Sequence, residues 1–254
     1  MKKLYILLAI LCSLGLLSAM PSAKSIFFAD SYMLRAAGVE ANYWNPARIN
    51  KAPGGELWLP ALNTGVSISN NALSLHKYNY FVSRDTLHTK DKEKLLKGMR
   101  GKLALSAEAS ISTFGFTSGY VALSSANHLF AKVRAQEDIL RLALYGNNKD
   151  EYRFGKEANG ADGIAYSDIT LGFGGFKLPY LDQYVPDIYI GASLSALAGI
   201  GSVETQKFDA IVSNNTESGL SVDVEAQARY VTVGAGFKSM LGLYSEVYPN
   251  LEVG

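Results

Sequence analysis

The chain has 254 residues, of which 48% are hydrophobic, 19% are charged and 24 are glycine. The 24 basic residues balance the 23 acidic ones, so the composition does not favour the basic surface that nucleic-acid binding usually requires. The high apolar content excludes a disordered chain, and abundant glycine and aromatic residues beside only 7 prolines favour strands and turns over helices. The length allows one large domain or two small ones.

Residues 1–23 have the pattern of a secretory signal peptide. Lys2 and Lys3 precede an apolar run from Leu4 to Ala19, and small residues follow it. The run is shorter than a spanning helix usually needs, so we predict cleavage near residue 23 and export of the protein; an uncleaved anchor is the alternative. The single cysteine, Cys12, lies in this run, so the mature chain would form no disulfide and no thiolate metal site.

Residues 24–52 are predicted to form a plug-like segment ahead of the strands, with a short helical pattern from Asp30 to Asn50. The apolar residues that can share one face of this helix are Met33, Leu34, Ala37 and Ala41. Pro46 is expected to end the helix, because residues before a proline leave the α region, and Pro53-Gly54-Gly55 is expected to form a turn.

From residue 53 onward the main pattern is period-2 alternation, which sends successive side chains to opposite faces of a strand. The clearest alternation covers residues 101–113, 163–177, 187–198 and 220–238, the last with a bulge near Tyr230 where the parity of the apolar residues shifts. Shorter strands are predicted at 56–69, 73–82, 114–124 and 207–212, and a hairpin turn at 214–216. Residues 89–99 and 135–144 have helical spacing, and we expect these two short helices in loops or against a barrel end.

Three features favour a transmembrane barrel over a soluble sandwich. The alternation at 220–238 is longer than the roughly 3 to 10 residues of most soluble strands. Charged residues lie on the more polar side of the alternation, where a barrel offers them a wet lumen; they are Glu108, Asp168, Asp223, Glu225 and Arg229. Aromatic residues collect near predicted strand ends, as in an interfacial girdle; they are Tyr78, Tyr80, Phe81, Phe114, Phe116, Tyr120, Phe173, Phe176, Tyr184, Tyr189, Tyr244 and Tyr248. The predicted fold is therefore all-β, an antiparallel transmembrane β-barrel with a short N-terminal helical plug.

The segment from Ala36 to Ala47 (AAGVEANYWNPA) resembles the N-terminal region of FadL-type outer-membrane proteins, a group that includes long-chain fatty-acid transporters and PorV-like proteins. The resemblance rests on an Ala/Gly-rich stretch that ends in an aromatic residue followed by Asn45, Pro46 and Ala47. The later order of helices and Gly-rich strands is also similar to that of less-studied members. The resemblance implies a barrel of about fourteen strands in the outer membrane, with the N-terminal segment as a plug in its lumen.

The C-terminal end departs from this family pattern. Such barrels usually close with a strand that ends in an aromatic residue, whereas this chain ends with the residues from Pro249 to Gly254. About 200 residues follow the signal and plug, enough for roughly 8 to 10 tall strands. We therefore expect residues 53–254 to lack the C-terminal strands of the barrel; a smaller complete barrel is the alternative.

The sequence contains no recognisable motif of a catalytic or metal-binding site. His76, His88 and His128 lack metal-ligand spacing and are expected at the surface or in loops. The glycine-rich runs at 172–175 and 234–236 lack the context of a phosphate loop, so they are expected to allow curvature or close approach of the plug. Lumen carboxylates such as those at 223 and 225 usually solvate the interior or pair with a cation such as Arg229. We predict no enzymatic activity, no metal and no cofactor.

The expected function is passive uptake of a small hydrophobic compound across the outer membrane, with membrane lipid as the other partner and no nucleic acid. Transfer of the compound from water to an apolar pocket would gain about 25 cal/mol per Å² of buried surface, and movement of the plug would open a path. The residues expected on the plug or along the path are Met33, Leu34, Tyr43, Trp44, Asn45 and Pro46. Two alternatives remain: an outer-membrane scaffold or shuttle for secreted proteins, and a soluble exported β-sandwich or adhesin.

Overall fold

The structure is a computed structural model that describes residues 31–245, apart from 53, 61–62, 73, 84–85, 100, 147–150, 182–186 and 216–218. The predicted signal peptide, the C-terminal residues 246–254, Tyr184 and Tyr248 lie outside the described residues. The helices are η1 (Ser31–Leu34), α3 (Ala41–Trp44), η2 (Pro46–Lys51), α4 (Leu75–Val82), α5 (Thr89–Met99), α6 (Glu137–Tyr145) and η3 (Pro179–Leu181). The strands are β1 (Glu56–Trp58), β2 (Thr64–Asn70), β3 (Lys102–Ser118), β4 (Val121–Gln136), β5 (Glu151–Gly155), β6 (Gly160–Lys177), β7 (Ile188–Asn215), β8 (Gly219–Val231) and β9 (Gly234–Ser245).

The strands form one nine-stranded antiparallel sheet, which confirms the predicted all-β class. Strands β3, β4, β6 and β7 lie side by side, while β8 and β9 pair with the two halves of β7 and form one edge. Strands β1 and β2 pair with β3 and form the other edge. Among the described strands no ladder joins these two edges, so the sheet is open and the predicted barrel is not closed.

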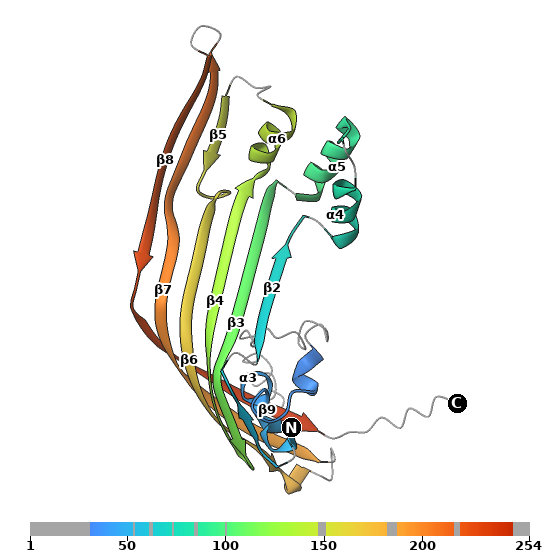
Figure 1. Ribbon diagram of the computed structural model, residues 1–254, viewed down its shortest axis with the longest axis vertical. Helices are drawn as coiled ribbons and strands as arrows, with labels where there is room; N and C mark the ends of the chain where they lie inside the picture. Colours follow the sequence, from blue (N-terminus) through green and yellow to red (C-terminus); the bar gives the residue numbers. More distant parts are fainter. Residues whose placement is uncertain are drawn as a thin grey trace, which may run out of the picture.

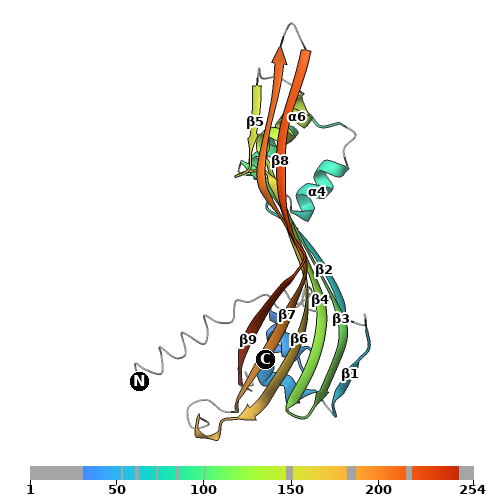
Figure 2. The same ribbon diagram turned by 90° about the vertical axis from the view of Figure 1, so that its left-hand side faces the viewer.

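The sheet is tall, bent and strongly twisted (Figure 1). Its lower half curls around the N-terminal elements η1, α3 and η2, which lie between β9 and β1 (Figure 2). Its upper half carries α4, α5 and α6. None of the helices in the described part of the chain is long and apolar enough to span a bilayer.

The strand register separates the sheet into two faces of opposite character. Ala126 contacts Tyr43 of the N-terminal segment, so even-numbered residues of β4 face that segment and odd-numbered ones face away. We call these the plug face and the outer face.

On the outer face, apolar residues of neighbouring strands lie in register. Phe116, Leu123, Leu171 and Leu194 form one such row across β3, β4, β6 and β7. Further exposed apolar residues of the outer face are Val66, Ile68, Leu105, Leu129, Val133, Ile169, Phe173, Phe237, Leu241 and Leu243. The lower outer face is therefore an uncovered apolar surface.

On the plug face, a row of charged residues crosses the strands nearer the upper end of the sheet. Arg229 lies opposite Glu204, Glu204 opposite Asp162, and Asp162 opposite Lys132, across β8, β7, β6 and β4. Asp162 also accepts a hydrogen bond from Nη2 of Arg134 at 2.7 Å. The alternation predicted for 163–177 and 187–198 is present, with the apolar set on the outer face.

Several strand predictions were wrong in their boundaries. Residues 114–124 are not one strand, because the β3–β4 hairpin turns at Gly119, whose φ of 58° suits a glycine. The stretches 187–198 and 207–212 belong to a single strand, β7. Residues 220–238 are split after Val231, and β8 and β9 then pair with different halves of β7. Asn214 and Asn215, predicted in a hairpin turn, are instead the last residues of β7 and pair with β8, and residue 216 lies outside the described residues.

The helix predictions were partly right. The predicted helix at 89–99 is α5, and the one at 135–144 is α6, shifted by two residues at its start. Of the stretch 73–82, predicted as a strand, residues 75–82 form α4 instead, and Leu75, Tyr78 and Val82 recur there at helical spacing. The N-terminal segment is not one helix but the three short turns η1, α3 and η2.

Candidate functional site

The candidate site is the contact between the N-terminal segment and the plug face. We call residues 31–52 the plug and the strand surface beneath it the seat. Nearly all plug residues from Ala36 to Ala47 are buried, whereas Met33 and Leu34 are exposed. Because η1, α3 and η2 are each at most six residues long, the plug depends on contacts with the sheet for its stability.

Three asparagine side chains attach the plug to the main chain of the sheet. In each case Nδ2 donates a hydrogen bond to a strand carbonyl oxygen at 3.0 Å: Asn42 to Thr170, Asn45 to Leu243, and Asn50 to Gly175. Nδ2 of Asn42 also donates to Oγ of Ser124 at 2.8 Å. The three bonds reach β6 and β9, so they hold the plug across the width of the seat.

Glycines of the strands provide the space that these contacts require. A Cβ atom added at any of five glycines would overlap the plug: Gly172 against Asn42, Gly174 and Gly191 against Pro46, Gly175 against Asn50, and Gly242 against Asn45. A side chain at these positions would displace the plug, as predicted for the run at 172–175. Gly236 differs, because a Cβ atom there would make ordinary contacts with Leu197.

Local turn chemistry fixes the path of the plug at Asn45 and Pro46. Asn45 is extended and its Oδ1 accepts a hydrogen bond from the main-chain N–H of Ala47 at 3.2 Å. Pro46 is the first residue of η2, a position that suits proline because its missing N–H would have no helical partner. The predicted helix end therefore lies at Trp44, and Pro46 begins the next turn.

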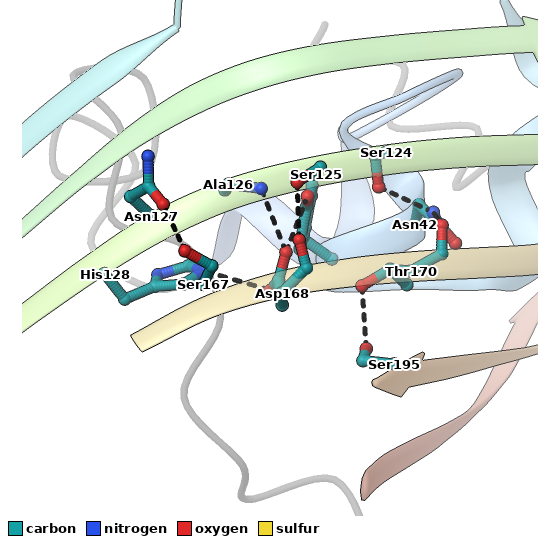
Figure 3. Close-up of polar contacts among 11 residues, drawn as sticks. Asn42, Ser124, Ser125, Ala126, Asn127, His128, Ser167, Asp168, Thr170 and Ser195 are labelled. Carbon is teal, nitrogen blue, oxygen red and sulfur yellow. Dashed lines mark hydrogen bonds and ion pairs between the residues drawn. The ribbon is translucent and has the colours of Figure 1, made fainter. Parts of the chain in front are cut away.

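A buried carboxylate, Asp168, lies at the centre of the contact between the plug and β4 and β6 (Figure 3). Its Oδ1 accepts hydrogen bonds from the N–H of Ala126 at 3.0 Å and from the hydroxyl of Tyr43 at 3.3 Å. Its Oδ2 lies 3.0 Å from Nε2 of His128, whose ring stacks on Tyr166. The carboxylate therefore links one plug residue to two strands.

Burial, and next the nearby Asp168 carboxylate, raise the pKa of Tyr43 far above its ordinary value. The phenol therefore stays protonated at any physiological pH and remains the hydrogen-bond donor to Asp168.

Two cations of the plug lie over tyrosine rings at the lower end of the seat. The guanidinium of Arg48 lies 4.0 Å from the ring centre of Tyr244, and Nζ of Lys51 lies 3.7 Å from that of Tyr189. These two tyrosines were predicted as part of an interfacial girdle, but they face the plug. Tyr120 and Phe176, which stack at 5.1 Å near the lower strand ends, remain candidates for such a girdle.

The structure brings only some of the predicted plug residues into the seat. Tyr43, Asn45 and Pro46 lie in it, and Trp44 packs edge-on against Tyr32 at 5.5 Å. Met33 and Leu34 are 44% and 60% exposed and do not share the buried face of Ala41 that a continuous helix would give them.

The five predicted lumen residues all lie on the plug face by register. Asp168 is in the seat, Glu108 lies higher on β3, and Asp223, Glu225 and Arg229 lie on β8. Glu225 pairs with Nζ of Lys207 at 2.5 Å and not with Arg229, which lies opposite Glu204. Within the described residues, no three His, Cys, Asp or Glu side chains are grouped so that they could hold a metal ion.

Sequence reasoning missed Asn42, Asn50 and His128. His128 was expected at the surface, but it lies in β4 with its side chain 13% exposed. In β4, His128 has the parity of Ala126, which lies opposite Asp168, so the ring and the carboxylate share one face of the sheet. Asn42 and Asn50 carry no local signal, because their partners lie more than 80 residues away in the chain.

A family model matches residues 51–246, and the chain belongs to that family, which is described as a family of unknown function (DUF5723). The match covers the sheet and only the last residues of the plug. No curated protein and no solved structure matches the chain significantly.

Proposed function

We propose that the DUF5723 chain forms the wall of an outer-membrane β-barrel that admits small hydrophobic compounds passively, with residues 31–52 as a plug in its lumen. The outer face would contact lipid and the plug face would line the lumen.

The observation that carries this proposal is the opposite character of the two sheet faces. Leu171, Leu194 and Phe237 are 42%, 57% and 81% exposed, and they continue into an apolar surface over five strands. Soluble monomers rarely expose contiguous apolar patches beyond a few hundred Å². Charged residues in the lumen and apolar residues toward lipid are the arrangement of membrane barrels.

The strand lengths fit this assignment. Outer-face residues of β4 run from Val121 to Val133, which exceeds the about 9 to 11 residues that a tilted membrane strand needs. A bilayer tolerates no unpaired strand edge, so the proposal requires that further strands pair with β8–β9 and with β1–β2 in the membrane.

The seat suggests how such a passage would be closed. The plug lies in the lower half of the curve of the sheet, and its contacts include several hydrogen bonds, which water can replace when the plug moves. Passage then requires no energy source, since an apolar compound gains free energy on leaving water.

The charges on the plug face favour a second candidate, a scaffold or shuttle for secreted proteins. The row from Arg229 to Lys132 has charges of both signs, which suits the polar surface of a protein better than a hydrocarbon.

Extraction tests the barrel. We expect the full chain to remain in the membrane pellet after an alkaline wash and to need detergent for solubility; extraction into aqueous buffer would contradict both membrane functions and support the soluble sandwich. Uptake of a hydrophobic dye by cells with and without the gene then separates the two membrane functions. Lower uptake without the gene supports the transporter, and unchanged uptake with a loss of secreted proteins supports the scaffold.

A further inference from the structure

We infer that the helical layer of α5 and α6 lies at the level of the lipid head groups, and that Lys90, Lys94 and Lys97 bind lipid phosphates there. This inference rests on the proposed membrane location. It adds an interaction surface on the opposite side of the sheet from the seat.

Helices α5 and α6 lie on the outer face of the sheet. Leu103 of β3 has the same parity as Leu105 and Ile111, which face away from the plug, and it packs with Leu96 of α5 and Leu140 of α6. On β5 and β7, the buried residues Tyr152 and Val212 lie opposite each other in register, and Ile139 and Leu142 of α6 pack against their cluster. The register through β8 places this cluster on the outer face as well.

These helices border the exposed apolar surface of the outer face. Helices α5 and α6 cover the upper end of the outer face, while the lower part is bare (Figure 1). Leu105 and Val133, which form the next outer-face pair below Leu103, are already 42% and 48% exposed. On β3 and β4 the lower border of the helical layer therefore meets the upper end of the exposed apolar residues, and we place the border between the hydrocarbon and the head groups there.

Helix α5 has a positively charged face. Lys90, Lys94 and Lys97 are exposed and spaced i, i+4 and i+7, so they share one face of the helix, opposite the buried residues Leu96 and Met99. Glu93 is the acidic residue beside them, so this face has a net charge of +2.

The other charges of α5 have partners inside the helical layer. Asp91 is buried and accepts a hydrogen bond from the hydroxyl of Tyr80 at 2.8 Å, and Nζ of Lys92 donates to the carbonyl of Leu144 at 2.5 Å. Lys90 and Lys97 are thus the cations of this helix that are most available to an external anion.

The chemistry of the head-group region matches this surface. Lysine keeps its alkyl chain along apolar surface while its ammonium group reaches phosphate, and tyrosines concentrate at the same depth. Tyr78 of α4 is 52% exposed beside this layer, and Nζ of Lys94 lies 4.9 Å from the ring centre of Tyr80. A lipid phosphate is the anion that such an arrangement meets at a bilayer border.

The test compares lipid selectivity of the full chain in vesicles of phosphatidylcholine that contain phosphatidylglycerol. Spin-labelled forms of the two lipids report their relative association with the protein surface. We expect the wild-type chain to associate with phosphatidylglycerol more strongly than with phosphatidylcholine. In the double variant K90Q/K97Q, the ratio of the two association constants should fall about fivefold for each lysine removed, at low salt. K90R/K97R should keep the wild-type ratio, as should K132Q/K207Q, which removes two lysines from the plug face.

Two outcomes overturn the inference, and a third overturns the proposed function instead. If K90Q/K97Q keeps the wild-type preference, or if K132Q/K207Q loses as much, the α5 lysines do not bind lipid phosphate. If the wild-type chain does not float with the vesicles after an alkaline wash, the membrane location itself is wrong. Floating of both double variants with the vesicles shows that a lost preference does not come from failure to insert.

Discussion

Oδ1 of Asn42 occupies the space that a Cβ atom would take on Gly172, while Nδ2 of the same residue donates to the carbonyl of Thr170 at 3.0 Å. The amide thus hydrogen-bonds the main chain of β6 at close range, and it can approach because Gly172 has no side chain. The same relation joins Asn45 with Gly242 and Asn50 with Gly175. The plug and the sheet are complementary through pairs of an asparagine and a glycine.

The substitution Gly174→Ala is expected to displace the plug. Its Cβ atom would overlap the carbonyl of Pro46, which is main chain and cannot rotate away. Overpacking of this kind costs about 1–3 kcal/mol. Trypsin should then cleave after Arg48 faster than in wild type. Gly236→Ala is the control, because its Cβ atom would lie 3.8 Å from Cδ1 of Leu197 and no closer to any other neighbour. Equal cleavage in the two variants would show that the glycines do not position the plug.

Replacement of Asn45 by alanine should also weaken docking of the plug on the sheet, in this case by the loss of hydrogen bonds. It removes the hydrogen bond to the carbonyl of Leu243 and the one from the N–H of Ala47. Loss of a partner for buried polar groups costs about 1–3 kcal/mol. Cleavage after Arg48 reports the loss, and Asn79→Ala on the exposed face of α4 serves as the control. Wild-type cleavage in Asn45→Ala would mean that the turn at Pro46 holds its shape without this amide.

Features with a short period in the sequence were predictable. Alternation identified the two faces of β6 and the lower half of β7, because every second side chain meets the same surroundings. It also placed Asp168 on the polar side. The helix at 89–99 was predictable because its stripe of Leu95, Leu96 and Met99 has no strand-like alternation.

Features that depend on distant partners were not predictable. The alternating pattern cannot tell where a strand turns, so the hairpin at Gly119 and the join between the halves of β7 were missed. The pattern also does not indicate which strands are neighbours in the sheet. The open edges were therefore not predictable, because they depend on strand pairing. The seat was found only in outline, because Asn42 and Gly172 acquire their roles from each other across 130 residues of chain.

Docking of the plug should weaken at alkaline pH through Tyr43. Burial raises the pKa of this phenol in the docked state, so its contribution is complete below the ordinary tyrosine pKa of about 10. The contribution decreases as the pH rises further, because the released plug can ionise and the docked one cannot. Trypsin cleavage after Arg48 should therefore increase between about pH 10 and pH 11 in wild type.

The variant Tyr43→Phe separates this effect from the titration of other tyrosines. It should show faster cleavage than wild type at neutral pH, since it lacks the hydrogen bond to Asp168, and a smaller increase above about pH 10. If cleavage of this variant above about pH 10 increased as much as cleavage of the wild type, the alkaline effect would come from another group.

A charge on the outer face should be costly only if that face contacts lipid. Leu171 lies in the middle of the apolar row and is 42% exposed, so in water Leu171→Arg would change stability little. At the bilayer midplane an arginine costs about 2–4 kcal/mol. The free energy of unfolding from vesicles should therefore decrease by that amount, as followed by urea titration.

Gln227→Arg is the matched control for this charge, because residue 227 is exposed on β8 and its odd-numbered neighbours Glu225 and Arg229 already place charges on the plug face. Its unfolding free energy should stay within about 0.5 kcal/mol of wild type. If both arginines cost the same, the two faces meet the same solvent and the sheet does not separate lipid from a lumen. A large cost for Leu171→Arg alone means that the apolar row is immersed in hydrocarbon, which a soluble sandwich does not provide.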